Sequence, residues 1–254
     1  MVKIKLLSFF LLCGLACTAF GSGLVVEYKF DGSLMDSGSD GNTTNTLTAA
    51  ADPAYTQGLS GEALYCNSNT FTAADSNDLD LASQYTIEAF IKPYLLSGIQ
   101  YILSKSSYKM GISDGNLGVY HTQSDGTVVG GFSVPLTLNR WQHIAVTADG
   151  STITLYLNGK AASSFLYNGT ILNSTASLSI GSISGSNQYN GIIDEVRMFG
   201  AVKTASYIYS RALYSCGDLP QEDIDSDCRI TVEDFYIAAE QWLLCDGDTR
   251  TDCY

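Results

Sequence analysis

The chain has 254 residues, of which 45% are hydrophobic and 11% aromatic. This composition supports a packed core and excludes a chain that is disordered throughout. The formal net charge is −13, from 26 acidic and 13 basic residues. A nucleic-acid-binding protein needs a basic face to displace counterions, and a peripheral protein on anionic lipid also needs basic residues. The charge therefore argues against both kinds of partner.

The N-terminus is typical of a secretory signal. Two lysines within the first five residues precede an apolar run over residues 6–20, and small residues follow at 21–23. The run is short for a membrane span. We expect residues 1–21 to be removed on export, which makes the mature protein secreted or attached to the cell surface, with no integral membrane span. Two alternatives stay open: a buried N-terminal strand or helix, and lipoprotein processing at Cys17.

The body of the chain has the pattern of a β protein. Between residues 24 and 199, apolar residues recur with a period of two in short segments separated by Gly, Asn, Asp and Ser. We expect a strand over 86–92 and a hairpin over 142–157. Three pairs supply turns that tolerate positive φ: Asp125-Gly126, Asp149-Gly150 and Asn158-Gly159. These features predict an all-β, antiparallel sandwich or jelly roll over residues 22–215.

Five blocks of this body occur in the order found in a known family. They are YKFDG at 28–32, YTIEAFIKP at 85–93, RWQHIAVT at 140–147, LYLNGK at 155–160 and GIIDEVRMF at 191–199. Over residues 24–214 the chain resembles laminin-G-like, concanavalin A-like jelly-roll domains. The resemblance implies the fold. It leaves the function open, because this fold hosts lectin-like domains, protein-binding domains and glycoside hydrolases.

Catalytic patterns are missing from the sequence. Jelly-roll glucanases that resemble this fold carry a strand of the form E-x-D-x-E, and no such segment is present; Glu88 is alone on its strand. Of the two histidines, His143 lies inside a strand block, and no G-x-S-x-G elbow precedes a helix. We therefore expect a non-catalytic binding protein. A polysaccharide-degrading hydrolase or lyase and a structural surface protein remain the alternatives.

A lectin-like sandwich recognises sugars through aromatic and amide side chains on loops, and the chain has 16 tyrosines. Candidates are chosen because each lies beside Gly or Ser outside the clearest strand patterns. They are Tyr108, Tyr120, His121, Asn187 and Tyr189. The expected ligand is a carbohydrate or an extracellular protein.

A calcium ion is a second expectation for the body. Strict alternation puts Asp194 on the same face as Val196 and Met198, and a carboxylate on an apolar face needs a metal or several hydrogen bonds. The family resemblance implies calcium near the two ends of the domain, where Asp31 and Asp36 can add oxygen ligands. In the alternative, Asp194 bonds backbone amides and the early acids occupy turns.

Residues 216–254 differ from the body, with 11 acidic and 2 basic residues. Four of the seven cysteines lie here: Cys216, Cys228, Cys245 and Cys253. In an exported protein this density predicts two disulfides in a small module, with the pairing open. A zinc site is the competing interpretation. Cys66 is left over, and we expect it to be a buried strand thiol.

The tail also contains a spacing typical of a calcium loop. Over residues 223–234 the oxygen donors fall at the loop's ligand positions: Asp223, Asp225, Asp227, the carbonyl of Arg229, Thr231 and Asp234. A helical apolar stripe follows. Loop and helix resemble half of a dockerin module, which implies Ca²⁺ and a cohesin-like partner. Cys228 replaces the usual glycine, and no second repeat follows. An acidic tail without metal is the alternative.

Overall fold

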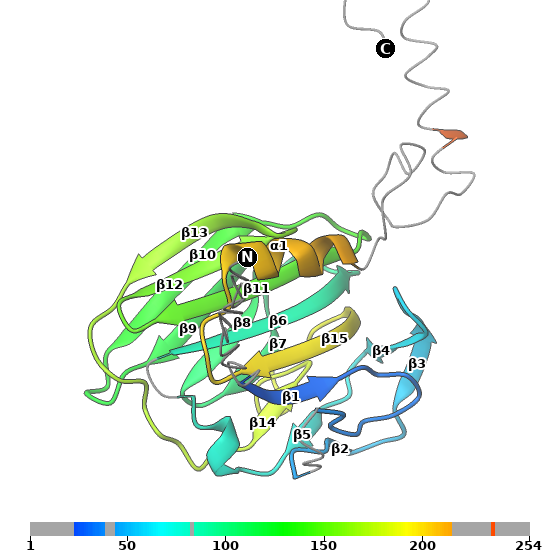
Figure 1. Ribbon diagram of the computed structural model, residues 1–254. Coiled ribbons are helices and arrows are strands. Elements are labelled where there is room, and N and C mark those ends of the chain that lie inside the picture. Colours follow the sequence, from blue (N-terminus) through cyan, green and yellow to red (C-terminus); the bar gives the residue numbers. More distant parts are fainter. Residues whose placement is uncertain (1–22, 39–43, 82–83, 215–234, 237–254) are drawn as a thin grey trace, which may run out of the picture.

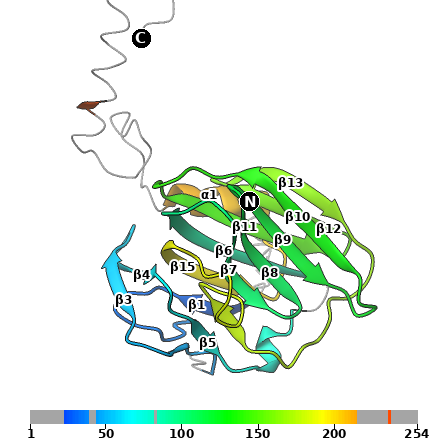
Figure 2. The same cartoon turned by 180° about the vertical axis from the view of Figure 1, so that it is seen from behind.

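The computed structural model describes residues 23–38, 44–81, 84–214 and 235–236, and the structural statements below concern these residues. They form two antiparallel sheets packed face to face (Figures 1 and 2). Sheet A has the order β13-β12-β11-β6-β15-β4-β3, with β1 paired to β15, and sheet B has the order β10-β9-β8-β7-β14-β5-β2. The expectation of an all-β antiparallel sandwich is confirmed.

The strands of sheet A are β1 (Leu24–Tyr28), β3 (Ala54–Gln57), β4 (Glu62–Cys66), β6 (Gln84–Pro93), β11 (Gln142–Asp149), β12 (Thr152–Leu157), β13 (Lys160–Leu166) and β15 (Gly191–Phe199). Those of sheet B are β2 (Thr48–Ala49), β5 (Phe71–Ala73), β7 (Ile99–Lys105), β8 (Tyr108–Ser113), β9 (Asn116–Thr122), β10 (Val128–Pro135) and β14 (Leu178–Ile180). A short 3₁₀ helix, η1 (Asn77–Leu79), and one α-helix, α1 (Ala205–Tyr214), complete the described elements.

The predicted hairpin is present as β11 and β12. Ile144 lies opposite Leu157 and Ala148 opposite Ile153, so the apolar residues of both strands share the face toward sheet B. The next turn has φ of 48° at Asn158 and 78° at Gly159, and this positive pair connects β12 to β13. Period-two patterning combined with turn residues therefore predicted this part of the fold correctly.

The interior of the sandwich is built by strict alternation along most strands. In β6, Ile87, Ala89 and Ile91 belong to the core between the sheets. Phe90 points the other way, into a smaller apolar cluster on the outer face of sheet A. That outer face therefore has an apolar surface of its own, on which other parts of the chain pack.

Strand β15 departs from strict alternation, and this corrects the expected position of Asp194. The pairing with β6 shifts register between Asp194 and Arg197, and Glu195 has φ of 48°, which marks a β-bulge. Because the extra residue reverses the facing of the strand, Val196 and Met198 enter the core while Asp194 lies opposite Phe90 on the outer face. The prediction that Asp194 shares a face with Val196 and Met198 is wrong.

Helix α1 lies across the outer face of sheet A (Figure 1). Ile208 is fully buried there in a cluster with Ala145 and Tyr156. The helix begins beside Thr204, whose hydroxyl accepts a hydrogen bond from the backbone N–H of Tyr207 at 3.2 Å. In the described part of the chain, no helix has the length and apolar character needed to cross a membrane.

Candidate functional site

Three of the five predicted ligand-binding residues are core residues. Tyr108, His121 and Tyr189 are each 1% exposed, so none of them lies on a ligand-accessible loop. The Tyr108 hydroxyl donates to the carbonyl of Leu79 at 3.0 Å. Burial lowers the pKa of His121 to about 4, which keeps its ring neutral at ordinary pH. The glycines and serines next to these residues indicate turns, but they do not predict whether a neighbouring side chain points into the core or toward solvent.

The other two candidates are accessible but lie apart. Tyr120 is half-buried on β9 and meets the ring of Phe132 edge to face, with centroids 5.2 Å apart. Asn187 is exposed in the segment before β15, where its φ is 48°. Its backbone carbonyl accepts a hydrogen bond from the N–H of Tyr101 at 2.9 Å. Asn187 is thus the one candidate that lies on an exposed loop.

The three carboxylates expected to hold calcium in the body do not converge on one point. Asp194 Oδ2 accepts the N–H of Leu59 at 3.1 Å and its Oδ1 accepts the N–H of Glu195 at 2.8 Å. Asp31 Oδ1 accepts the N–H of Glu62 at 2.9 Å, beside the same turn. Among the described residues, no group of three or more His, Cys, Asp or Glu is arranged to hold a metal ion.

Asp36 is engaged elsewhere. Its Oδ1 accepts the backbone N–H groups of Glu27 and Gly38, each at 3.0 Å. The alternative for these acids, hydrogen bonding to backbone amides, therefore describes all three carboxylates, and a calcium site in the body stays a prediction. Cys66 is a free, buried thiol on β4, as expected. The predicted calcium loop and the four tail cysteines lie outside the described residues.

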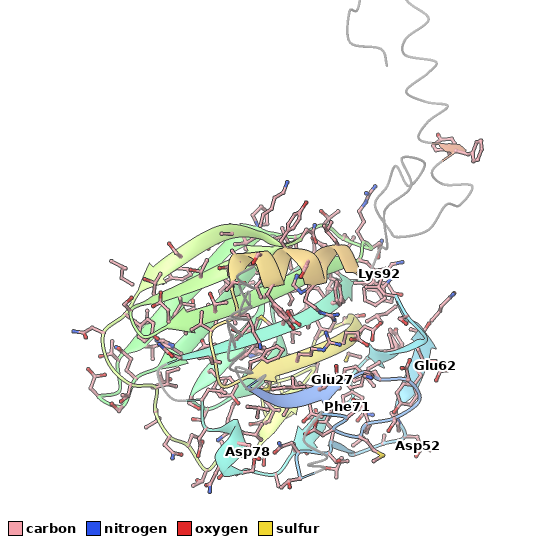
Figure 3. All side chains as sticks on the ribbon, viewed as in Figure 1. Glu27, Asp52, Glu62, Phe71, Asp78 and Lys92 are labelled. Carbon is pink, nitrogen blue, oxygen red and sulfur yellow. The ribbon has the colours of Figure 1, made fainter. Side chains whose placement is uncertain are left out.

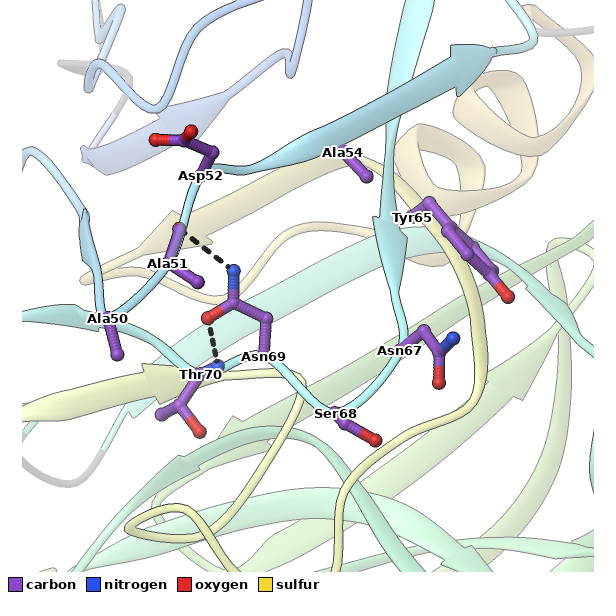
Figure 4. Close-up of a pocket in the computed structure, with 9 residues that line it drawn as sticks. All are labelled: Ala50, Ala51, Asp52, Ala54, Tyr65, Asn67, Ser68, Asn69 and Thr70. Atoms are coloured by element: carbon purple, nitrogen blue, oxygen red, sulfur yellow. Dashed lines mark hydrogen bonds between the residues drawn. The ribbon is translucent and has the colours of Figure 1, made fainter.

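A pocket of about 380 Å³ has the chemistry of a binding site, although the sequence did not single out its residues. We call it the amide pocket. It opens between the segment joining β2 to β3 and the segment joining β4 to β5 (Figure 4). Its polar and aromatic lining consists of Asp52, Tyr65, Asn67, Ser68, Asn69 and Thr70.

The volume of the amide pocket falls at the lower end of the range usual for small-ligand sites. Figure 4 shows Tyr65 at one side of the amide pocket and Asp52 at the other, with the β4–β5 segment between them.

Side-chain amides hold the walls of the amide pocket together. Asn69 Nδ2 donates to the carbonyl of Ala51 at 3.0 Å, which ties the β4–β5 segment to the β2–β3 segment. Asn69 Oδ1 accepts the N–H of Thr70 at 2.9 Å. Gln188 Nε2 donates to the carbonyl of Ser68 at 2.9 Å, so the segment that carries Asn187 supports the pocket from a third direction. These bonds fix the pocket without using the side chains of Asn67 and Ser68.

The amide pocket presents groups that suit a hydroxyl-rich ligand. Within the described part of the chain, the exposed side chains of Asp52, Asn67 and Ser68 have no hydrogen-bond partner, so they are available to a ligand. The half-buried ring of Tyr65 supplies an apolar wall with a polar end. The exposed Tyr94 continues this wall, with its ring centroid 6.0 Å from that of Tyr65.

The sequence contains a signal for this pocket that period-two analysis passes over. Residues 67–70 are a run of amide and hydroxyl residues that follows directly after a strand. What the sequence does not reveal is the second wall, because the β2–β3 segment is brought to the pocket by the pairing of β3 with β4 and of β2 with β5.

Comparisons with known proteins agree with this fold. The family model Laminin_G_3, described as the concanavalin A-like lectin/glucanases superfamily, matches residues 67–209, which is more than half of the chain. A search of the curated proteins found no match.

Several solved structures are similar to the chain at low identity. Domain 4 of AbnA, a GH43 extracellular arabinanase from Geobacillus stearothermophilus, in complex with arabinotriose, has a TM-score of 0.62 and 21% identity over 74% of this chain and 98% of that one. The binding domain of Paraclostridial Mosquitocidal Protein 1 gives 0.63 and 20%, over 76% and 52%. The binding domain of botulinum neurotoxin serotype G gives 0.64 and 17%, over 76% and 51%.

The chain spans about half the length of each of these two toxin domains and nearly all of the arabinanase domain. At these identities the likeness concerns the fold. The family match, together with the two-sheet antiparallel sandwich, shows that the chain belongs to the concanavalin A-like lectin/glucanase superfamily.

Proposed function

We propose that this protein is an exported, non-catalytic carbohydrate-binding protein, whose sandwich holds a saccharide in the amide pocket. The observation that carries the proposal is the pairing of an aromatic wall, Tyr65, with the unengaged polar side chains of Asn67 and Ser68. Sugar rings present apolar faces and a rim of hydroxyls, and this combination of groups complements both. The similarity to an arabinanase domain in complex with arabinotriose supports the same ligand class.

The experiment is a saccharide-binding measurement on the full chain, starting with an oligosaccharide array and continuing with calorimetry on the best neutral ligand. Asn67→Ala and Tyr65→Ala are expected to weaken binding about fivefold to tenfold, the equivalent of one to one and a half hydrogen bonds. Asn168→Ala, an exposed amide on a different loop, serves as the matched control. Equal affinity for all three variants would remove the amide pocket from the proposal, and no saccharide binding at all would favour a protein ligand.

A non-catalytic role is part of the proposal. Hydrolysis of a glycosidic bond needs two carboxyl groups that flank the bond. Two acids on the outer face of sheet A, Glu27 and Glu195, are instead paired with an arginine: Arg197 lies 2.7 Å from Glu27 and 2.8 Å from Glu195. We expect a bound oligosaccharide to be recovered intact after prolonged incubation. Release of reducing ends by the purified protein would support the alternative, a hydrolase or lyase.

We further propose that the tail binds calcium through Asp223, Asp225, Asp227, Thr231 and Asp234, and attaches the protein to an extracellular or cell-surface assembly. Support comes from the ligand spacing alone. In the full chain, calcium titration is expected to reveal one site that Asp227→Ala abolishes. Asp218→Ala, which changes an acid outside the loop, should leave that site intact. A titration without heat or proton release would contradict the proposal.

A further inference from the structure

A second pocket, of about 390 Å³, lies on the outer face of sheet A beside α1. We call it the arginine pocket. Its apolar lining is Phe90 from β6 and Leu59 from the β3–β4 turn. Its charged lining comes from three elements or their ends: Lys29, Glu195, Arg197 and Arg211.

The two arginines are held in fixed positions. Arg197 lies across from Glu27 on β1 and Glu88 on β6, and its Nε is 2.7 Å from Glu27 Oε1. Arg211 reaches the same network from α1, with its Nε 3.4 Å from Glu88 Oε1. The bulge at Glu195 brings a carboxylate to both guanidinium groups, at 2.8 Å from Arg197 and 3.4 Å from Arg211.

The lining of the arginine pocket contains more cationic than anionic side chains. Glu27 and Glu88 balance the arginines, but they do not line the pocket, so three cationic side chains and one carboxylate face it. That carboxylate, Glu195, is already paired with both arginines. Lys29 is the least committed cation: its side chain is 47% exposed, and its Nζ lies 3.8 Å from Glu27. A pocket of this kind stands out in a chain of net charge −13, and its cationic donors suit a carboxylate.

The two pockets are connected by one apolar cluster. Phe90, Ala63, Trp141 and Ile192 form its buried part, and Leu59 and Tyr65 pack against it. Leu59 precedes β4 and lines the arginine pocket, whereas Tyr65 lies near the other end of β4 and lines the amide pocket. A strand of this length spans about 17 Å at ~3.3 Å per residue. One extended ligand can therefore reach both pockets, and joining two contacts in one chain raises affinity.

We propose that the arginine pocket binds the carboxylate of a uronic acid, and that the ligand of the sandwich is an acidic polysaccharide lying across the outer face of β4. This inference rests on the proposed carbohydrate-binding function and names the class of carbohydrate.

The test is calorimetry of the full chain with oligogalacturonate and with the same oligomer after its carboxyl groups are reduced to alcohols. The acidic oligomer is expected to bind about tenfold more tightly than its reduced form, and less tightly as salt rises. Lys29→Gln and Arg211→Gln should each remove most of that preference, by weakening the acidic oligomer much more than the reduced one. Lys160→Gln, an exposed lysine on β13, is the control.

Because Arg211 also pairs α1 with sheet A, its variant is accepted only if its melting temperature stays close to that of the wild type; Lys29→Gln, at an exposed position, gives the same test without that complication. Equal binding of the two oligomers, lost in Asn67→Ala but kept in Lys29→Gln, would overturn this inference and leave the proposed function standing. If neither these oligomers nor any neutral saccharide binds, both proposals fail.

Discussion

Asp194 is a carboxyl group whose ionisation is opposed by its surroundings. It is fully buried beneath the β3–β4 turn, and its pKa is raised to about 7. Burial is the main cause; the nearby Glu195 and Asp31 also raise the pKa, while the hydrogen bonds from the amides of Leu59 and Glu195 lower it. Since the folded-state pKa exceeds the unfolded value of 3.8, the unfolded chain ionises first as the pH rises. The contribution of Asp194 to stability is thus complete below about pH 4 and is lost as the pH rises through 7.

The resulting prediction is a melting temperature that falls between pH 5 and pH 8. Asp194→Asn cannot ionise, so its melting temperature should change less over this range, even if the loss of one amide bond lowers the starting value. Calorimetric scans at several pH values measure this slope. Asp52→Asn, at an exposed position, should keep the wild-type slope. A wild-type slope in Asp194→Asn would contradict the assignment.

Lys105 is a second buried charge with a clear role. Its side chain is fully buried, and its Nζ lies 2.7 Å from Asp75 Oδ1 and 3.0 Å from Asp80 Oδ1, with the carbonyl of Ser174 also accepting. The lysine that joins these two acids lies at the end of β7 in sheet B, about 25 residues later in the chain.

Removal of the Lys105 ammonium should leave two carboxylates side by side without a counter-charge. We expect Lys105→Met to cost about 3–5 kcal/mol in the free energy of unfolding, as is typical when one partner of a buried ion pair is lost. Lys109→Met, on a half-buried lysine of β8, should cost less than about 1 kcal/mol. Urea denaturation measures both values, and a similar cost for the two variants would show that the buried pairing adds little.

Residue-level expectations failed where a side chain's facing had to be known. Tyr108 and His121 were chosen for their neighbours in the sequence, yet both lie on strands and point into the core. Tyr65 was not among the candidates, yet its side chain lines the amide pocket, where the β2–β3 and β4–β5 segments meet. Facing is set by strand pairing, which is a property of the whole sheet and not of a short window of sequence.

At the scale of elements, apolar alternation predicted the regular strands correctly and missed the bulge in β15. It located β6 and the β11–β12 hairpin, whose partners match residue for residue. It failed at Glu195, because a bulge adds one residue without a sequence mark, and everything before it on β15 then faces the opposite way from the prediction. That same bulge places Asp194 under a turn and brings Glu195 to the two arginines.

The contact of α1 with the β12–β13 turn provides a test at this scale. A Cβ on Gly159 would lie 2.9 Å from Tyr209 Cα and 3.0 Å from Ala212 Cβ, and Gly159 has φ of +78°. Gly126 has a similar φ of +86°, with nothing within 4 Å of its Cβ position. Gly126→Ala should therefore cost only the backbone term, about 1 kcal/mol, while Gly159→Ala should cost more because it also displaces the helix. Urea denaturation curves of the two variants give the difference, and equal costs would mean that α1 is not held against this turn.

At the scale of the molecule, the chain divides into a sandwich and an acidic tail with separate proposed roles. The described strands and α1 lie within residues 24–214, and so do both pockets and the core between the sheets. Eleven of the 26 acidic residues fall in residues 216–254, where the proposed calcium loop lies. Saccharide binding and calcium binding are therefore expected to be separable.

The prediction is that a chain ending at residue 215 keeps the saccharide affinity of the full chain and the melting temperature of its sandwich, but loses the calcium site. The physical reason is that the described core clusters and the lining of both pockets are made of residues before 215. Calorimetric titrations with saccharide and with calcium, run on both chains, measure the two functions independently. A tenfold fall in saccharide affinity on truncation would instead mean that the tail contributes to the ligand site.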